Sequence, residues 1–316
     1  GTSGTVPNIY CLTKDEPTCK TCLAAIKTTP IDASALTAPN GTVLALPRSN
    51  PNRRRNTSAL LRTMHSDGRM RNILIDCGKT FSESALTWFV EYRLRRIDAL
   101  LLTHGHADAV LGLDDLRQWT IGGAAKSVQD SIPVYLSKEC MSVVESVFPY
   151  LVDTKKATGG GDVPALDFHV FGDGPEGYKP FNIEELEVIP IEVDHGKVSS
   201  GAPFKCLGYR FNNLTYLSDV SSIPPTASDL IQGTTTLIID ALHREPHASH
   251  LSIYQSASEA ARLLPQDGRA IMVGMSHDTE HEELNCILAE DEGLKAKGVR
   301  AQAGFDGMRV DVRGCR

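Results

Sequence analysis

The stretch that decides the fold is Leu100-Leu101-Leu102-Thr103-His104-Gly105-His106-Ala107-Asp108-Ala109, in which an apolar run leads directly into two histidines and an aspartate at alternate positions. Residues 97–103 predict a buried strand, and residues from Gly112 onward predict a turn followed by a helix that begins near Asp114. An α/β protein presents a site in this order, as a strand, a polar loop and a helix.

The polar residues of this loop have the chemistry of metal ligands. Two imidazoles two residues apart can direct their nitrogens at one cation, and the carboxylate of Asp108 can reach the same pocket. A His-x-His on a loop is more often a pair of solvated side chains, but its place after a buried strand favours a metal site here. We therefore expect His104, His106 and Asp108 to be ligands.

Two further polar motifs follow predicted strands. Asp194-His195-Gly196 comes after an apolar strand, and Tyr216-Leu217-Ser218-Asp219 ends another. Taken singly, the first is typical of a turn and Asp219 of a helix cap. Because both lie at the carboxyl ends of strands, where an α/β sheet gathers its ligands, we expect His195 and Asp219 to join His104 and His106.

In this order the three motifs resemble those of the metallo-β-lactamase superfamily. More narrowly, the chain is similar to the branch that holds the cyclic-phosphate phosphodiesterase of phosphonate breakdown and the 3′-tRNA-processing endonucleases. The resemblance extends from the glycine-rich residues 1–7 to residues 304–308. It implies an α/β fold of the αββα sandwich type, in which two mixed sheets pack together with helices outside.

The pattern of apolar residues agrees with that fold. Helices are expected to begin near Phe81, Asp114, Ser137, Ser252 and Glu280. We expect one domain over residues 1–316, with a glycine-rich flexible insertion around 122–180 that is either a lid or without function. Strands are expected at 42–46, 59–63, 72–76, 97–103, 134–136, 186–193, 205–211, 214–218, 236–240, 270–274 and 308–312.

The resemblance also implies two metal positions. The first matches His104, His106, His195 and Asp219, and all four are present. The second takes two aspartates, which match Asp108 and Asp219, and two histidines. At the positions of these two histidines, this sequence has Ala109 and Gly274. We expect a mononuclear centre, with the alternative that His243, His247, His250 or His277 restores the second metal. Zn²⁺ is expected, and Mn²⁺ or Fe²⁺ would also accept these ligands.

Two residues are candidates for proton transfer. Asp108, without a second metal to bind, is expected to act as general base. His250 matches the position at which related phosphodiesterases hold a histidine that is not a ligand, which implies a general-acid or oxyanion-stabilising role. The alternative for His250 is a capping contact with the helix that follows.

Three cysteines cluster near the start of the sequence. Cys11, Cys19 and Cys22 offer three thiolates, and a redox Cys-x-x-Cys would need a helix start in a thioredoxin-like unit, which we do not expect here. The resemblance supplies a fourth ligand, His277, and with it a closed structural zinc site. The alternative is that the cysteines are free thiols. The other five cysteines are scattered singly.

Two other features bear on the site. Asn52-Arg53-Arg54-Arg55-Asn56 is the one dense basic run, and it is either a solvated surface or an anion contact. Asp76 matches a superfamily aspartate that orients the ligand loop.

The composition limits the function. A net charge of −7 argues against a general nucleic-acid binder. No apolar run approaches the roughly 18 residues that span a bilayer, and no signal peptide is seen, so we expect a cytoplasmic protein. The resemblance implies a metal-dependent phosphodiesterase acting on a small nucleotide or cyclic phosphate. The alternatives are a thioester or ester hydrolase and a non-catalytic member that binds metal or nucleotide. The sequence indicates no oligomeric state.

Overall fold

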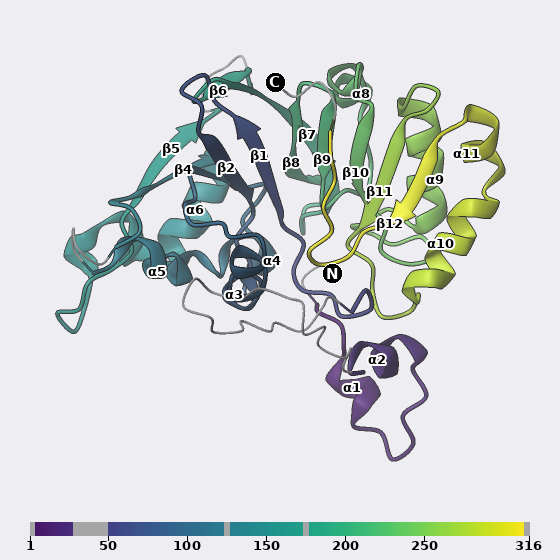
Figure 1. Ribbon diagram of the computed structural model, residues 1–316, viewed down its shortest axis with the longest axis horizontal. Coiled ribbons are helices and arrows are strands. Elements are labelled where there is room, and N and C mark those ends of the chain that lie inside the picture. The colour runs from purple at the N-terminus through teal and green to yellow at the C-terminus, as the bar shows by residue number, and fades with distance from the viewer. Residues whose placement is uncertain (1–3, 28–49, 123–126, 173–176, 313–316) are drawn as a thin grey trace.

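The computed structural model describes residues 4–27, 50–122, 127–172 and 177–312. Two β-sheets pack face to face, and helices cover the outer side of each (Figure 1). The first sheet has the order β1-β2-β3-β4-β5, and the second has the order β12-β11-β10-β9-β8-β7-β6. The expected αββα sandwich is confirmed.

The first sheet is parallel except for its edge strand β1, which runs antiparallel to β2. Its strands are β1 (Ala59–Met64), β2 (Met70–Ile75), β3 (Ala99–Leu101), β4 (Ile132–Ser137) and β5 (Leu166–Phe171). The helices of this half are α3 (Phe81–Glu91), α4 (Ala107–Val110), η1 (Leu113–Leu116), α5 (Arg117–Thr120), α6 (Lys138–Val147), α7 (Pro149–Val152) and η2 (Thr154–Lys156).

The second sheet is parallel from β9 to β12 and antiparallel from β6 to β9. Its strands are β6 (Phe181–Ile183), β7 (Leu186–Lys197), β8 (Pro203–Phe211), β9 (Leu214–Leu217), β10 (Thr236–Asp240), β11 (Arg269–Val273) and β12 (Arg300–Ala303). Its helices are α8 (Pro225–Ile231), α9 (Ile253–Leu263), α10 (His281–Glu290) and α11 (Glu292–Lys297). Within the described ranges, no helix has the length and apolar character needed to cross a membrane.

The two sheets are held together by an apolar cluster to which both contribute. Ile73 and Leu101 of the first sheet belong to it, as do Tyr209, Phe211 and Tyr216 of the second, and all five are almost completely buried. The remaining face of each sheet packs against its own helices in a separate cluster. Burial of apolar surface, at roughly 25 cal/mol per Å², is the main force that holds the layers together.

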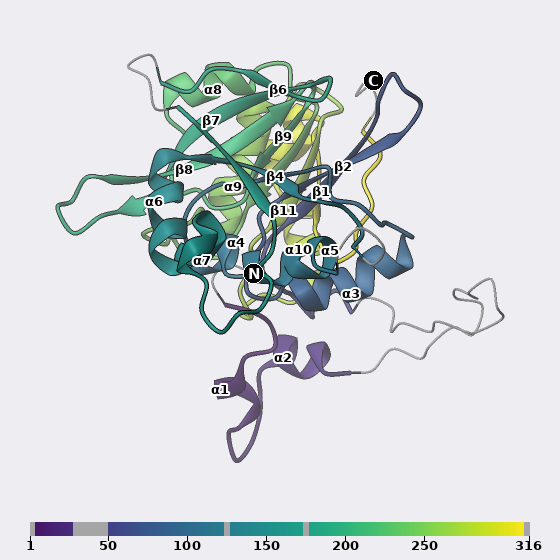
Figure 2. The same ribbon diagram turned by 90° about the vertical axis from the view of Figure 1, so that its left-hand side faces the viewer.

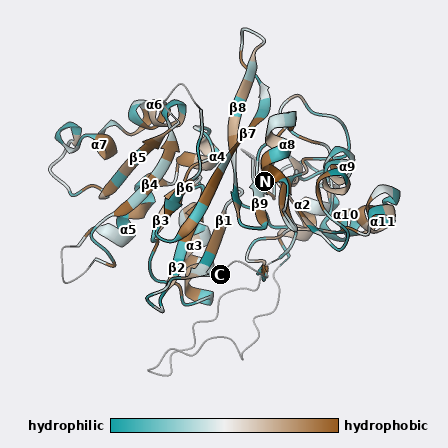
Figure 3. Cartoon of the chain, turned by 90° about the horizontal axis from the view of Figure 1, so that it is seen from above, coloured by the Kyte–Doolittle hydropathy of each residue, from teal (hydrophilic) through white to brown (hydrophobic). Residues whose placement is uncertain are grey.

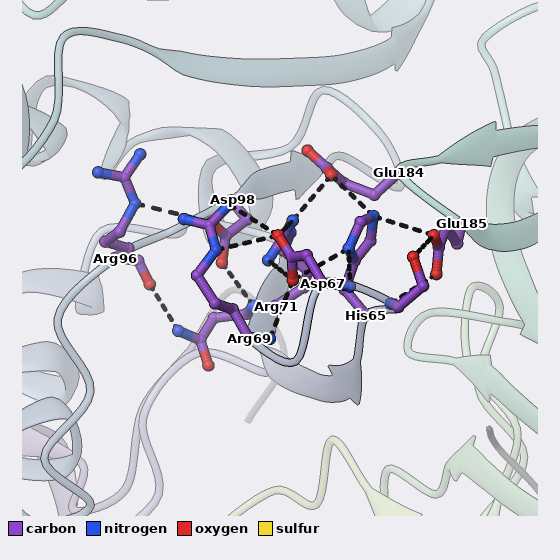
Figure 4. A network of polar contacts seen from close by, with 10 residues as sticks. His65, Asp67, Arg69, Arg71, Arg96, Asp98, Glu184 and Glu185 are labelled. Atoms are coloured by element: carbon purple, nitrogen blue, oxygen red, sulfur yellow. Dashed lines mark hydrogen bonds and ion pairs between the residues drawn. The ribbon is translucent and has the colours of Figure 1, made fainter.

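A polar network joins the sheets at the turns between β1 and β2 and between β6 and β7 (Figure 4). Arg71 donates to Asp67 at 2.8 Å and to Glu184 at 3.2 Å. The imidazole of His65 lies between Asp67 and the pair Glu184 and Glu185. These contacts fix the relative position of the two turns.

The N-terminal segment forms two short helices, α1 (Ile9–Leu12) and α2 (Lys20–Ala25), that lie outside the two layers (Figures 1 and 2). It is attached through an antiparallel bridge between Val6 and Arg54. Its small apolar cluster contains Cys11 and Cys22.

Several expectations about the elements were wrong. Residues 308–312 form no strand; Met308, Val310 and Val312 instead line a cavity of about 550 Å³ that β1 and α3 also line. Strands β5, β6 and β12 were not expected, because they are short and largely exposed. The expected strand at 42–46 lies outside the described residues.

The stretch around 122–180, expected to be a flexible insertion, holds regular structure in its described part. It supplies β4 and β5, the last two strands of the first sheet, together with α6 and α7. Ile132, Val134 and Leu136 of β4 are completely buried. Strand β4 and helix α6 lie where a strand at 134–136 and a helix near Ser137 were expected, whereas β5, which follows the glycines at 159–161, was not expected.

Candidate metal centre

The three motif histidines meet at the carboxyl ends of β3 and β7. His104 follows β3, His106 is the N-cap of α4, and His195 lies near the end of β7. One nitrogen of each lies within 4.8 Å of the others, and His195 Nε2 is 3.3 Å from His106 Nδ1. The fold therefore brings together the three histidines that were expected from the sequence, although His106 and His195 are 89 residues apart in the chain.

Two of these imidazoles, those of His104 and His195, are oriented by hydrogen bonds at Nδ1. His195 Nδ1 donates to the backbone oxygen of Ser249 at 2.7 Å, which leaves the lone pair on Nε2, the nitrogen that faces His106. His104 Nδ1 lies 2.8 Å from the hydroxyl of Thr103, whose proton goes to the buried carboxylate of Asp76. Such outer contacts fix the tautomer that a metal ligand needs. Asp76 thus lies where an orienting residue was expected.

The charge state of the cluster suits a cation. Burial, together with the charge of neighbouring His106, lowers the pKa of His104 to about 3. Burial also lowers the pKa of His195. Neutral imidazoles with free lone pairs are the form that binds metal.

Two buried atoms of the site are left without a hydrogen-bond partner among the described residues. They are His104 Nε2 and Asp108 Oδ1, which lie 4.0 Å apart. A buried polar atom without a partner is costly unless something else binds it. Three imidazoles and nearby carboxylates are a donor set that fits a divalent cation such as zinc.

Asp219 follows β9 and is buried. It belongs to a second group of potential ligands, together with His195 and His250. Asp219 Oδ1 lies 3.8 Å from His250 Nδ1. Because His195 belongs to both groups, Asp219 and His250 border the three-histidine cluster.

The two positions that lack the superfamily histidines are closely packed. Ala109 is buried in the apolar cluster of the first sheet. Gly274 has a φ of +77°, and a Cβ there would lie 2.5 Å from Asp240 Oδ1. A histidine at 274 is therefore incompatible with the present position of Asp240.

Of the four histidines considered as replacements, His250 reaches the ligand groups. His277 lies among the N-terminal cysteines. The other two lie in a row with His250: the ring centroid of His247 is 5.4 Å from that of His250, and the ring centroid of His243 is 5.6 Å from that of His247.

Asp240 is a functional candidate that the sequence analysis did not select. It ends β10, is completely buried, and its Oδ2 accepts a hydrogen bond of 2.6 Å from His250 Nδ1. Burial lowers the pKa of His250, but the hydrogen bond and charge of Asp240 outweigh it and raise that pKa above its usual value. Its place at the end of a strand was the signal, because the same rule led to His195 and Asp219.

Close backbone packing fixes the ligand loop. A Cβ on Gly78 would lie 1.9 Å from the backbone oxygen of Asp108, and a Cβ on Gly105 would lie 2.7 Å from Val143 Cγ2. Only glycine permits these approaches, so the loop is held between the end of β2 and α6.

The second candidate metal site is formed by Cys11, Cys19, Cys22 and His277, whose ligand atoms lie within 4.8 Å of one another. His277 Nδ1 is 3.5 Å from Cys11 Sγ and 3.7 Å from Cys19 Sγ. Three thiols and one imidazole fit a closed tetrahedral zinc site.

The Cys-x-x-Cys of this cluster lies at the start of a short helix, because Cys19 is the N-cap of α2. Burial raises the pKa of Cys19, but hydrogen bonds from Cys22 and His277 outweigh it and bring that pKa to about 7. The helix is only six residues long and stands outside the sheets, unlike the helix of a thioredoxin-like unit.

The arginines of the basic run at 53–55 have partners within the protein. Arg54 is buried, and its guanidinium donates to the backbone oxygens of Ser276 and Thr279, on either side of His277. Arg53 and Arg55 pair with Glu83. Arg54 therefore holds the loop that carries the imidazole of the cysteine site.

The cysteine site leads to a prediction. Replacing Cys19→Ser and Cys22→Ser removes two of the three thiolate ligands, so we expect zinc content to fall by one equivalent per chain by elemental analysis. We also expect a lower Tm, since a structural zinc contributes directly to folding. The matched control is Cys286→Ser, an exposed thiol outside the cluster. Unchanged zinc in the double variant would contradict the assignment.

Comparison with known families decides the identity of this fold. Residues 71–275, about two thirds of the chain, match the family described as Beta-lactamase superfamily domain. The chain belongs to the metallo-β-lactamase superfamily. The matched region contains the three histidines, Asp108, Asp219, Asp240 and His250, and it ends next to Gly274.

Solved structures of this superfamily cover almost all of the chain. A diphosphatase of the PhnP family is similar over 99% of this chain and 95% of its own, with a TM-score of 0.69 and 26% identity. Zinc-bound PqqB from Methylobacterium extorquens is similar over 99% and 97%, with a TM-score of 0.61 and 18% identity, which shows the fold alone.

Two curated relatives are similar in sequence. The octanoyltransferase of Porphyromonas gingivalis is 27% identical over 252 residues, which are 78% of this chain and 44% of that protein. The ribonuclease Z of Clostridium acetobutylicum is 29% identical over 165 residues, which are 51% of this chain and 45% of that protein. The chain thus matches less than half the length of each.

Proposed function

We propose that the chain is a metal-dependent hydrolase that cleaves a phosphodiester bond in a small nucleotide or cyclic-phosphate-like substrate. The observation that carries the proposal is that the Asp240–His250 pair lies next to the three-histidine cluster. His250 and Asp219 form a group of potential ligands with His195, which is also a member of the cluster. The cluster supplies a cation site, and the pair supplies a proton donor.

His104, His106, His195 and Asp219 would hold the catalytic metal. When bound to such ligands, a divalent cation polarises a phosphoryl oxygen and lowers the pKa of water towards about 7. Zinc is the cation we propose, because imidazole and carboxylate are common zinc ligands; Mn²⁺ or Fe²⁺ would also be accepted.

Asp108 is proposed as the general base. It is buried beside His104, and its Oδ1 has no hydrogen-bond partner in the described part of the chain. The carboxylate takes the proton of the attacking water as the new bond to phosphorus forms.

His250 is proposed as the general acid. Its Nδ1 proton is held by Asp240, so that a second proton on Nε2 can be donated to the leaving oxygen as its bond to phosphorus breaks. The alternative role as a helix cap is not supported, because the cap of α9 is the side chain of Ser252.

We further propose that one metal is bound in this centre. Ala109 offers no ligand, and position 274 is closed by Asp240, which at the same time holds His250. The specific observation in favour of a second metal is the group of His195, Asp219 and His250. In that case His250 would be a ligand, oriented by Asp240 as carboxylates often orient zinc histidines.

The substrate class is supported by the relatives and by charge. The diphosphatase and the ribonuclease Z both have names that denote phosphate ester or anhydride cleavage. A net charge of −7 favours a small substrate over a long nucleic acid. Because an octanoyltransferase is among the relatives, ester or thioester hydrolysis is the second candidate function. A third is a member that binds metal or nucleotide without turnover.

Substitution of His250 tests the proton donor. We expect His250→Ala to lower kcat about 100-fold or more, the range typical of general acids, while zinc content stays at the wild-type value. Asp240→Asn should lower kcat less, because it disturbs only the orientation of the imidazole. The control is His243→Ala at the far end of the histidine row. Wild-type turnover in His250→Ala would refute the role, and loss of one zinc would make His250 a ligand.

Chromogenic reporters separate the three candidate functions. We expect steady-state hydrolysis of bis(p-nitrophenyl) phosphate to exceed that of p-nitrophenyl acetate and of an acyl thioester, and to disappear in His104→Ala, His106→Ala. Preference for the acyl reporters would favour the ester hydrolase. Silence on all three by a zinc-loaded protein would favour the non-catalytic member.

A further inference from the structure

The three histidines of the metal centre are not held in the same way. The other nitrogen of His104 meets Thr103, and that of His195 donates to Ser249. For His106, the described residues provide no such hydrogen bond; its Nδ1 lies 3.3 Å from His195 Nε2, within the cluster itself. His106 is also the exposed member of the cluster, whereas His104 and His195 are buried.

An aromatic ring lies against His106 instead. The ring of Phe204 is parallel to this imidazole, with an interplanar angle of 8° and a centroid distance of 4.8 Å. It meets His195 and His104 at steeper angles, with centroid distances of 5.9 and 6.4 Å. Phe204 thus contacts all three imidazoles and stacks on the one that lacks an orienting hydrogen bond.

The register of the β7–β8 hairpin places Phe204 there. Asp194 pairs with Lys205 and Lys197 pairs with Pro203, and the register shifts between these two pairs. His195 and Gly196 of β7 therefore lie opposite Phe204 of β8. Lys205 Nζ also binds Asp194 Oδ1 at 2.7 Å across this pair. The hairpin projects beyond the two sheets (Figure 3). Phe204 is the second residue of β8 and follows Pro203, which pairs with Lys197 next to the turn.

We propose that Phe204 is a positioning residue of the metal centre, which holds the His106 ring by stacking and covers one side of the cluster against water. This role rests on the metal centre of the proposed function. Stacked rings favour one relative orientation, and an apolar neighbour strengthens the interaction of a ligand with a cation. Phe204 therefore does for His106 what Thr103 and Ser249 do for the other two.

The test measures metal binding without substrate. Loss of a contact that orients a ligand typically weakens metal affinity 10- to 100-fold. We expect Phe204→Ala to raise the Kd of the catalytic zinc about tenfold, by competition with a chromogenic chelator, and to change the visible spectrum of the Co²⁺ form. Phe204→Tyr, which keeps the ring, should bind zinc as the wild type does. The double variant His104→Ala, His106→Ala gives the zinc affinity and the Co²⁺ spectrum of the cysteine site alone.

The matched control is Phe181→Ala. Phe181 is a half-buried phenylalanine of β6 that stacks on Tyr135 at 5.5 Å and 18°, and it is not part of the ligand cluster. Its loss should lower Tm without changing zinc affinity or the Co²⁺ spectrum. Wild-type affinity and spectrum in Phe204→Ala would overturn the positioning role. Zinc binding by the wild type without any hydrolysis would overturn the proposed function and leave this inference standing.

Discussion

The geometry of the candidate metal centre depends on the hydrogen bonds between Asp76 and Thr103. Asp76 is almost completely buried and has a φ of +62°, and its carboxylate accepts from both the backbone nitrogen and the hydroxyl of Thr103. Its own backbone nitrogen donates to Leu101 at the end of β3. These bonds connect the end of β2 to the loop after β3, and through Thr103 they set the tautomer of His104. A buried carboxylate with such bonds is costly to misplace.

The second sheet reaches the same loop by a different route. Leu207 of β8 donates its backbone proton to the oxygen of Thr103, and Tyr209 of β8 donates its hydroxyl proton to Leu102. The strand that carries Phe204 is therefore bonded to the loop that carries His104 and His106. His195, across the hairpin from Phe204, is thereby brought against the other two histidines. The geometry of the centre is thus a property of how the two layers are joined.

Much of the centre could be predicted from the sequence because its residues lie in short motifs at strand ends. His104, His106 and His195 are recognisable in this way, and the fold brings them together. Residues that act through distant contacts could not be predicted. Arg54 looks like part of a surface charge run, and Phe204 looks like an ordinary strand residue, because their partners are far away in the sequence.

The fold was predictable to a similar extent. Buried strands such as β3 and β10 are continuous apolar runs, whereas the edge strands β5, β6 and β12 show only brief alternation. Residues 308–312 have the alternation of a strand but lack a neighbouring strand to pair with, so they line a cavity instead. A pattern predicts which face of a segment is apolar; it does not supply the partner that completes a sheet.

We propose that one metal occupies the histidine centre and that a second metal occupies the cysteine site. Elemental analysis of metal per chain, on the wild type and on His104→Ala, His106→Ala, tests it most directly. We expect two equivalents in the wild type and one in the variant, with the remaining metal bound by the cysteine site. Three equivalents falling to one would contradict it, because His250 would then complete a second metal position and the single-metal mechanism would fail.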